Sequence, residues 1–282
     1  MSVTALTAWR RPSIIPGFGL TLGFALTYLS LIVLIPISAL ILRTTTMSWE
    51  KFYLVLTNER VLAALKVSFG ASLVAACINA LFGLIVAWVL VRYRFPGRRI
   101  VDAIVDLPFA LPTAVAGIAL TAIFAPTGWL GKYFDAFGIK IAYTWIGIVI
   151  ALTFIGLPFV VRTLQPVIEE IDRQVEEAAA TLGAHRGQTM WQVILPTLLP
   201  ALLTGFVLAF ARAVGEYGSV VFIAGNIPYQ TEIAPLLIVI RLEEFDYTGA
   251  AAIATIMLAI SFAMFLAINV IQAWARRRFG DV

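Results

Sequence analysis

The ionisable residues best placed for chemistry lie inside otherwise apolar sequence. Arg212 and Glu216 are four residues apart within the apolar stretch 200–224, a spacing that places both side chains on one face of a helix. Opposite charges that pair lower the cost of burying either group, so this pair either fixes helix packing or offers charge to a ligand. Gly215 and Gly218 flank Glu216 and would let a second helix or a ligand approach the backbone closely.

The chain lacks the side-chain sets that hydrolases and metalloenzymes use. Its single histidine, His185, has no partner of a metal-binding type nearby in the sequence, and we expect it to be a solvated loop residue. The phosphate-binding pattern Gly-x-x-x-x-Gly-Lys-[Ser/Thr] is missing, and the nearest fragment, Gly128 to Lys132, has the wrong spacing. Cys77 is the only cysteine and can form no internal disulfide. We therefore expect no enzymatic activity, no metal and no cofactor in this chain.

Composition predicts a membrane protein. Of the 282 residues, 61% are hydrophobic and only 13% are charged, against about 25% charged in soluble domains. About 20 apolar residues cross a hydrocarbon core of about 30 Å, and six such stretches occur. We predict an all-α transmembrane fold with a single domain over residues 17–273. Its six spans are expected at 17–42, 61–91, 101–125, 143–164, 200–224 and 247–273.

The distribution of basic residues predicts which side of each span faces the cytoplasm. One set of alternate loops carries eleven Lys and Arg residues and includes both chain ends, whereas the other set carries six. We therefore expect residues 1–16 and the tail 274–282 to be cytoplasmic, together with a loop at 165–199. The net charge of +4 is attributed to helix ends that contact anionic membrane lipid, so no nucleic-acid partner is expected. The first stretch is longer than the apolar core of a secretory signal, and we expect it to be retained.

The cytoplasmic loop has the pattern of an amphipathic helix. Between Ile168 and Gly183 apolar residues recur every three or four positions, and Gly183 follows the last of them, where a left-handed cap would end the helix. The other face carries five acidic residues between positions 169 and 177. Such a face repels anionic lipid headgroups, so we expect it to meet a basic cleft on a protein. Pro196 then begins the next segment, and force on the loop would tilt the fifth span.

The spacing of this loop resembles a motif of a known family. Glu177-Ala178-Ala179 is followed by Gly183 after three residues, and Val193 precedes Leu195-Pro196. This order resembles the EAA loop of ABC-importer permeases, with Val193 where the family has isoleucine. The resemblance implies a six-helix, type I permease in the bacterial inner membrane whose loop binds a separate ATPase. The coupling residues that it implies are Glu176, Glu177, Ala178, Ala179, Gly183, Leu195 and Pro196.

Further segments are similar to one branch of this family, the T-type permease subunits of bacterial sulfate/thiosulfate importers. They include residues 93–97, 106–117, 143–147, 158–163, 215–218, 222–226 and 244–247. The resemblance implies a W-type permease partner in a heterodimer, two copies of an ATPase that bind ATP and Mg, and a periplasmic sulfate/thiosulfate-binding protein. Two alternatives stay open. One is a molybdate or tungstate permease of the same family, and the other is an anion transporter driven by an ion gradient.

The remaining intramembrane features concern the third and fifth spans. Pro108 and Pro112 lack backbone donors, so we expect them to bend or interrupt the third span. Asp102 and Asp106 precede this break, where we expect them to start the helix and balance Arg98 and Arg99. If Arg212 lines a translocation path, its charge would attract a dianion and Glu216 would limit how tightly the anion is held. We expect the segment 226–247 to lie at the periplasmic interface.

Overall fold

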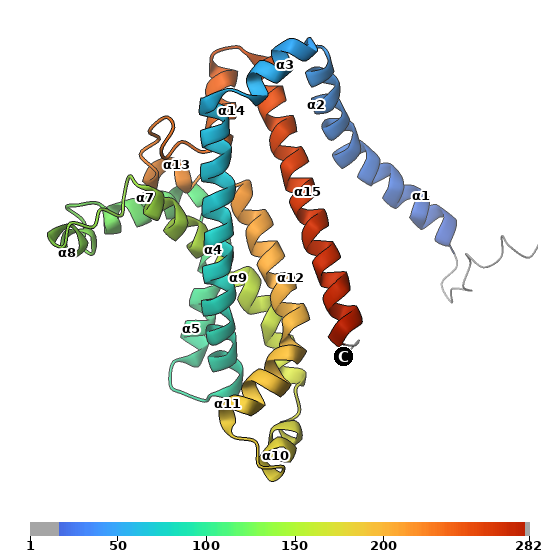
Figure 1. Cartoon of the computed structure of the whole chain (residues 1–282), viewed down its shortest axis with the longest axis vertical. Coiled ribbons are helices and arrows are strands. Elements are labelled where there is room, and N and C mark those ends of the chain that lie inside the picture. Colours follow the sequence, from blue (N-terminus) through green and yellow to red (C-terminus); the bar gives the residue numbers. More distant parts are fainter. Residues whose placement is uncertain (1–16, 280–282) are drawn as a thin grey trace, which may run out of the picture.

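The computed structural model describes residues 17–279, and no strand occurs within this part of the chain (Figure 1). The all-α prediction is confirmed. The predicted N-terminus, 1–16, and the last three residues of the predicted tail lie outside the described residues. The helices are α1 (Phe18–Leu29), η2 (Ser30–Leu34), α2 (Ile35–Thr45), α3 (Trp49–Leu56), α4 (Glu59–Arg92), α5 (Arg98–Val105), α6 (Leu107–Ala110), α7 (Thr113–Phe124), α8 (Gly131–Ala136), α9 (Trp145–Glu170), α10 (Arg173–Thr181), α11 (Arg186–Gln188), η3 (Thr189–Ile194), α12 (Leu195–Val214), α13 (Val220–Ile223), α14 (Ala234–Glu243) and α15 (Tyr247–Phe279).

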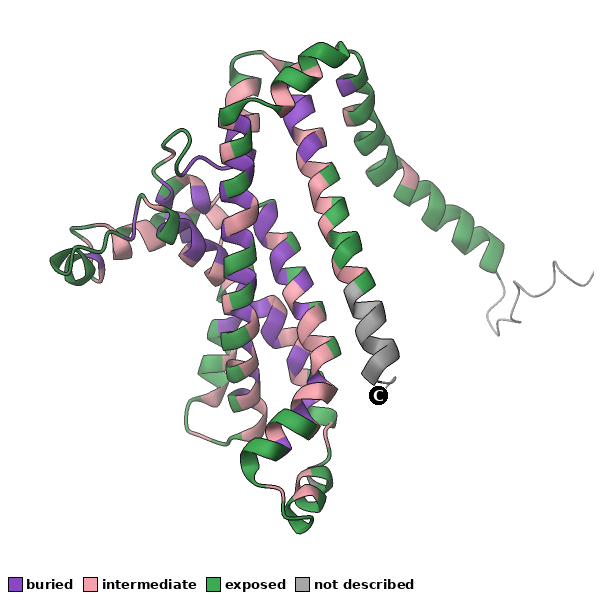
Figure 2. Ribbon diagram, viewed as in Figure 1, coloured by how far each residue is buried: buried purple, intermediate pink, exposed green. Residues whose placement is uncertain are grey.

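Helices α4, α9 and α12 form the buried centre of the molecule (Figure 2). Glycines let these helices approach one another closely, since a methyl group on Gly83 or Gly205 would collide with Val160 of α9. Gly156 of α9 lies against the Asn79 side chain of α4 in the same way. Leu90, Leu164 and Leu198 fill this interface near the C-terminal end of α4 and are almost completely buried.

The first long helix, formed by α1, η2 and α2, lies apart from this centre. None of the residues in its most apolar window is buried within the chain, and α1 points away from the bundle in Figures 1 and 2. Its contact with the rest of the molecule is made through α2 and α15, where the hydroxyls of Thr44 and Thr255 are 2.8 Å apart. An apolar helix exposed over this length requires lipid or another protein around it.

The predicted third span is not one continuous helix. The segment 98–124 is divided into α5, α6 and α7, and Leu111 and Pro112 are extended between the last two. A residue before proline is driven out of the helical region, which explains the interruption at this point. Within the described residues, five other helices are long and apolar enough to cross a membrane.

The break at Pro112 was expected from the sequence, but two helix ends differ from the ends of the predicted spans. The fourth span continues to Glu170, so the first six residues of the predicted cytoplasmic loop 165–199 belong to α9. The fifth span was expected over 200–224, but helix runs without a break from Arg186 and ends at Val214. The helix ends at Gly215 because side-chain hydrogen bonds fix the turn that follows. The sequence stays apolar through residue 224, so hydropathy gave no sign of this end.

Candidate functional site

The predicted amphipathic helix over 168–183 is divided in the structure. Ile168 is fully buried in α9, the chain becomes extended at Ile171, and Asp172 begins α10. The Asp172 carboxylate accepts a hydrogen bond from the backbone N–H of Gln174 at 3.0 Å and so acts as an N-cap. The apolar spacing indicated one helix because the period of three or four residues at Ile168 and Ile171 continues into α10 at Val175.

Gly183 ends α10 in a left-handed conformation with φ of 85°. The N–H of Gly183 donates to the Ala180 carbonyl, and the N–H of Ala184 donates to the Ala179 carbonyl, each at 3.0 Å. These two bonds are those of a Schellman motif. No atom outside the neighbouring residues lies within 4 Å of the position that a Cβ would take at Gly183, so backbone conformation alone favours glycine there.

His185 begins the next short helix, α11, rather than being only a solvated loop residue. Its Nδ1 accepts a hydrogen bond from the Gln188 N–H at 3.2 Å, and the Gln188 side chain accepts one from the His185 N–H at 3.0 Å. This reciprocal pair is a capping box. The tight turn 182–185 is therefore fixed on both sides by local hydrogen bonds.

The residues of the EAA motif divide between two faces of α10. Glu177 and Ala178 are exposed, whereas Glu176 and Ala179 are partly covered by the rest of the chain. Leu182, which follows α10, is 89% exposed. Val193 and Ile194 close the η3 turn, and Leu195 and Pro196 begin α12. Glu177 and Leu182 therefore lie on a surface that no other described part of the chain covers.

Arg212 and Glu216 are paired, but they lie at the end of a helix rather than well inside it. Arg212 is in the last turn of α12, and its Nη1 donates to Glu216 Oε2 at 2.5 Å. The other carboxylate oxygen accepts hydrogen bonds from the Ser219 N–H and hydroxyl at 3.0 and 3.1 Å. The side chain of Glu216 is 3% exposed and that of Arg212 is 35% exposed. The buried carboxylate therefore fixes the turn, and part of the guanidinium stays accessible.

The two glycines beside Glu216 have different surroundings. A methyl group on Gly218 would collide with the Thr113 hydroxyl at the start of α7, so the close approach expected at this glycine is present. Nothing lies within 4 Å of the corresponding position at Gly215. Gly117 of α7 approaches the Ser219 backbone equally closely. The turn 215–219 is thus packed against the beginning of α7, immediately after the break at Pro112.

Asp102 and Asp106 bind a residue that sequence reasoning missed. Arg162 of α9 donates from Nε to Asp106 Oδ1 at 2.8 Å and from Nη1 to Asp102 Oδ1 at 2.7 Å. Its Nη1 also donates to the Gln165 side chain. The direct contacts of these carboxylates are therefore with Arg162 and not with Arg98 or Arg99, because α9 lies beside α5 and α6. One signal was available: Arg162 is the only charged residue in α9 before its last two positions.

A second ion pair that the sequence did not reveal lies at the first turn of α4. Arg60 donates from Nε and Nη2 to the two carboxylate oxygens of Glu232 at 2.8 and 2.7 Å. Glu232 is 1% exposed and precedes α14 in the segment expected at the periplasmic interface. The parallel, two-point geometry is specific to arginine and fixes this segment on the first turn of α4.

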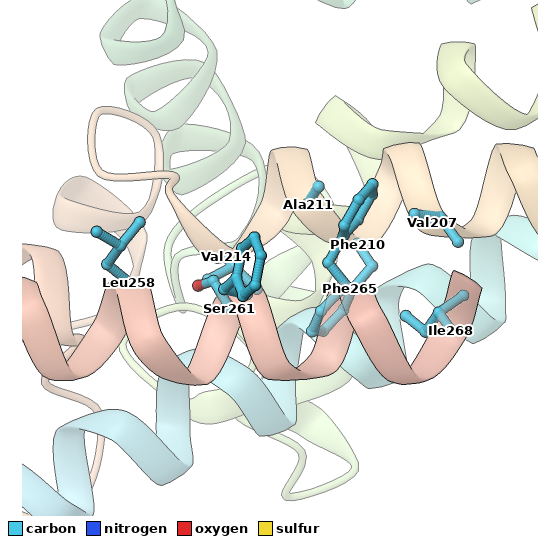
Figure 3. Close-up of a pocket in the computed structure, with 9 residues that line it drawn as sticks. Val207, Phe210, Ala211, Val214, Leu258, Ser261, Phe265 and Ile268 are labelled. Carbon is cyan, nitrogen blue, oxygen red and sulfur yellow. The ribbon is translucent and has the colours of Figure 1, made fainter. Parts of the chain in front are cut away.

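An apolar groove of about 260 Å³ lies between α12 and α15 (Figure 3). Phe210, Val214 and Phe265 are among the side chains that line it, and Ser261 is the only one of the described lining residues with a hydroxyl. Among the side chains that the structure describes, no charged one lines this groove. The Ser261 hydroxyl donates to the Met257 carbonyl, so this apolar lining suits a hydrocarbon surface better than an anion.

Comparison with known proteins decides the family. Residues 79–281 match the model of the family described as "Binding-protein-dependent transport system inner membrane component". The chain belongs to this family. Membership makes it an inner-membrane transport subunit, and the EAA loop lies within the matched region.

Curated relatives within the family are similar over almost their whole length. The chain is 50% identical to the sulfate transport system permease protein CysT of Escherichia coli K12 over 267 residues, which are 95% of each chain. It is also 50% identical to the CysT protein of Synechocystis sp. PCC 6803, over 90% of this chain and 89% of that protein.

Solved structures of ABC transporters have the same fold. A chain of a bacterial alginate ABC transporter, crystallised with a pentasaccharide-bound periplasmic protein, matches with a TM-score of 0.75 at 17% identity. The match covers 93% of this chain and 94% of that one. An inward-facing MetNI methionine ABC transporter matches with a TM-score of 0.56 at 19% identity, over 81% of this chain and 99% of that one. These likenesses confirm the type I ABC-importer permease fold.

Proposed function

We propose that this chain is the transmembrane permease subunit of an ATP-driven importer that carries sulfate or thiosulfate across the bacterial inner membrane. The observation that carries the substrate is the 50% identity to CysT proteins over 95% of the chain. Identity at this level extends through the membrane-spanning segments and is not confined to the EAA loop. Molybdate and tungstate are also tetrahedral dianions, and they are the alternative substrates that a transport assay must exclude.

The energy for transport comes, in this proposal, from a separate ATPase subunit present in two copies. The ATPase binds ATP and Mg, and the permease chain contributes no cofactor. A W-type permease completes a heterodimer, and a periplasmic binding protein delivers the anion. The exposed helix formed by α1 and η2 leaves room for a second membrane subunit, because lipid or another protein must cover this apolar surface.

The contact with the ATPase is assigned to α10 and the turn after it. Glu177 and Leu182 are both exposed, so α10 and its turn offer an acidic and an apolar side chain to a cleft with basic and apolar walls. Continuous helix runs from α11 through η3 into α12, so a displacement of the turn would reach Arg212 and Glu216. We assign Arg212 to the anion path, with Glu216 restraining it, since part of its guanidinium stays accessible.

The assembled transporter tests this proposal. The four kinds of subunit are coexpressed and reconstituted in liposomes, and uptake of radiolabelled sulfate is measured with competing thiosulfate, molybdate or tungstate. We expect ATP-dependent uptake that thiosulfate inhibits and that molybdate affects only in large excess. Uptake that persists without ATP in a proton or sodium gradient would reject the ATPase-driven mechanism. Uptake of molybdate in preference to sulfate would reject the substrate.

A matched pair of variants tests the assigned ATPase contact. Glu177→Gln removes a charge from the exposed face of α10, and Gln174→Ala changes an exposed side chain one turn earlier. We expect only Glu177→Gln to weaken binding of the ATPase to the detergent-solubilised permease, by about thirtyfold, because loss of one partner from a desolvated charge pair costs about 2 kcal/mol or more. Equal binding by both variants would place the contact elsewhere.

A further inference from the structure

One arginine joins the end of α4 to both sides of the break between α9 and α10. Arg92 is the last residue of α4, and its side chain is 12% exposed. Its guanidinium lies 5.3 Å from the ring centroid of Trp88, one helical turn earlier on the same face. Cation–π attraction to the indole ring restricts where the guanidinium can lie, so Trp88 helps to hold the Arg92 side chain in place.

The first contact of Arg92 is with the backbone at the end of α9. Its Nη2 donates to the carbonyl oxygen of Ile171 at 3.0 Å. Ile171 is the C-cap of α9, where carbonyl groups have no partner within the helix. The arginine therefore satisfies a free carbonyl at the position where the chain changes direction.

The second contact is with α10. The same Nη2 lies 3.0 Å from Oε1 of Glu176, which is in the first turn of α10. This contact explains why Glu176 is partly covered while Glu177, the neighbouring acidic residue, is exposed. Two adjacent glutamates on one helix thus have separate tasks: Glu176 faces the membrane-spanning bundle, and Glu177 faces outward.

The helix that carries Arg92 is suited to hold α10 in place. It has 34 residues, which corresponds to roughly 50 Å, and it contains no proline. Its packing against α9 and α12 forms the most buried part of the molecule, and its first turn is fixed by the pair of Arg60 and Glu232. A rigid helix fixed at its opposite end moves as one body, so a group at its terminus follows any shift of the helix.

We propose that Arg92 is a positioning residue for coupling: through Glu176 and Ile171 it fixes the angle of α10 relative to α4, so that α10 and the transmembrane bundle move together. This inference rests on the proposed function of α10 as the contact with the ATPase. Arg92 itself does not meet the ATPase in this proposal. Loss of the contact leaves the exposed face of α10 intact but lets the helix turn independently of α4.

The test exchanges the two charges. Arg92→Glu and Glu176→Arg are made singly and together in the complete transporter, and sulfate taken up per ATP hydrolysed is measured. We expect each single reversal to lower this ratio by about fivefold, the effect of replacing one attraction by a repulsion, and the double reversal to restore most of it. Arg94→Glu is the matched control, because Arg94 is exposed in the same basic turn. Its ratio should equal that of the unmodified transporter.

A second readout does not depend on transport. With Cys77 replaced by serine, spin labels at Val89 of α4 and Ala180 of α10 report the distance between the two helices in the assembled complex. We expect a narrow distance distribution in the unmodified protein, a broad one in each single reversal, and a narrow one again in the double reversal. Narrow distributions in the single reversals, or a double reversal no better than the singles in either readout, would overturn the role of Arg92. If instead the unmodified transporter takes up no sulfate while the labels behave as expected, the proposed substrate fails and the positioning role stands.

Discussion

Arg162 in α9 and Asp106 at the junction of α5 and α6 are joined by two hydrogen bonds, one from Nε and one from Nη2. The same guanidinium also binds the side chain and the backbone carbonyl of Asp102. A continuous helix would hold these two carboxylates in place by itself. In this protein the helix is interrupted just beyond them, and an arginine from a neighbouring helix supplies the missing constraint.

We predict that Arg162→Gln destabilises the permease by about 1 kcal/mol, because it removes an ion-pair network whose side chains are all partly exposed. Arg162→Lys keeps the charge but loses the two-point contact with Asp106. The stability of this variant should therefore lie between that of the glutamine variant and that of the unmodified protein. Thermal unfolding of the purified permease in detergent measures the effect. Identical midpoints for all three proteins would show that the network contributes nothing to stability.

The loop turn at Gly183 gives a second prediction. A residue with a Cβ in the left-handed conformation costs about 1–2 kcal/mol, and asparagine tolerates this conformation better than alanine. Because no neighbouring group opposes a Cβ at this position, the cost should come from the backbone alone. We expect Gly183→Ala to lower sulfate uptake per ATP hydrolysed, and Gly183→Asn to have a smaller effect. A higher sulfate uptake per ATP hydrolysed in the alanine variant than in the asparagine variant would contradict this explanation.

Hydropathy was sufficient to predict the helical class and the approximate position of the long helices, because about 20 apolar residues are needed to cross a bilayer. It failed at Gly215, where α12 ends although the apolar sequence continues. It also failed at Asp172, whose carboxylate begins a new helix inside a continuous apolar period. The pairing of Arg212 with Glu216 was accessible because both residues lie within one turn. The partners of Arg162, Arg92 and Arg60 are 56 to 172 residues away in sequence, so they required knowledge of which helices are neighbours.

The pair of Arg212 and Glu216 permits a test of the anion path. Arg212→Gln removes the charge next to a buried carboxylate that keeps its two bonds from Ser219, so we expect a loss of stability of about 2 kcal/mol. If Arg212 also attracts the anion, uptake should fall further than stability and expression account for. Arg212→Lys retains the charge and is the matched control. Normal uptake by the glutamine variant at equal expression would exclude Arg212 from the path.

The two glycines beside Glu216 provide the most direct test of the packing between the 215–219 turn and α7. Gly218→Ala places a methyl group against the Thr113 hydroxyl, and overpacking of this kind costs about 1–3 kcal/mol. Gly215→Ala is the matched control, since Gly215 has a negative φ of −89° and open space around it. We expect Gly218→Ala to lower the thermal midpoint and sulfate uptake, and Gly215→Ala to change neither.

A compensating change at Thr113 distinguishes this close contact from a general sensitivity of the turn. Thr113→Ala removes the hydroxyl that the new methyl group would meet, so the double variant with Gly218→Ala should recover part of the lost stability. The interaction energy from the four proteins measures the contact. Additive losses in the double variant would mean that Gly218 is required for another reason, such as the approach of a ligand or of the second permease subunit to the backbone at this turn.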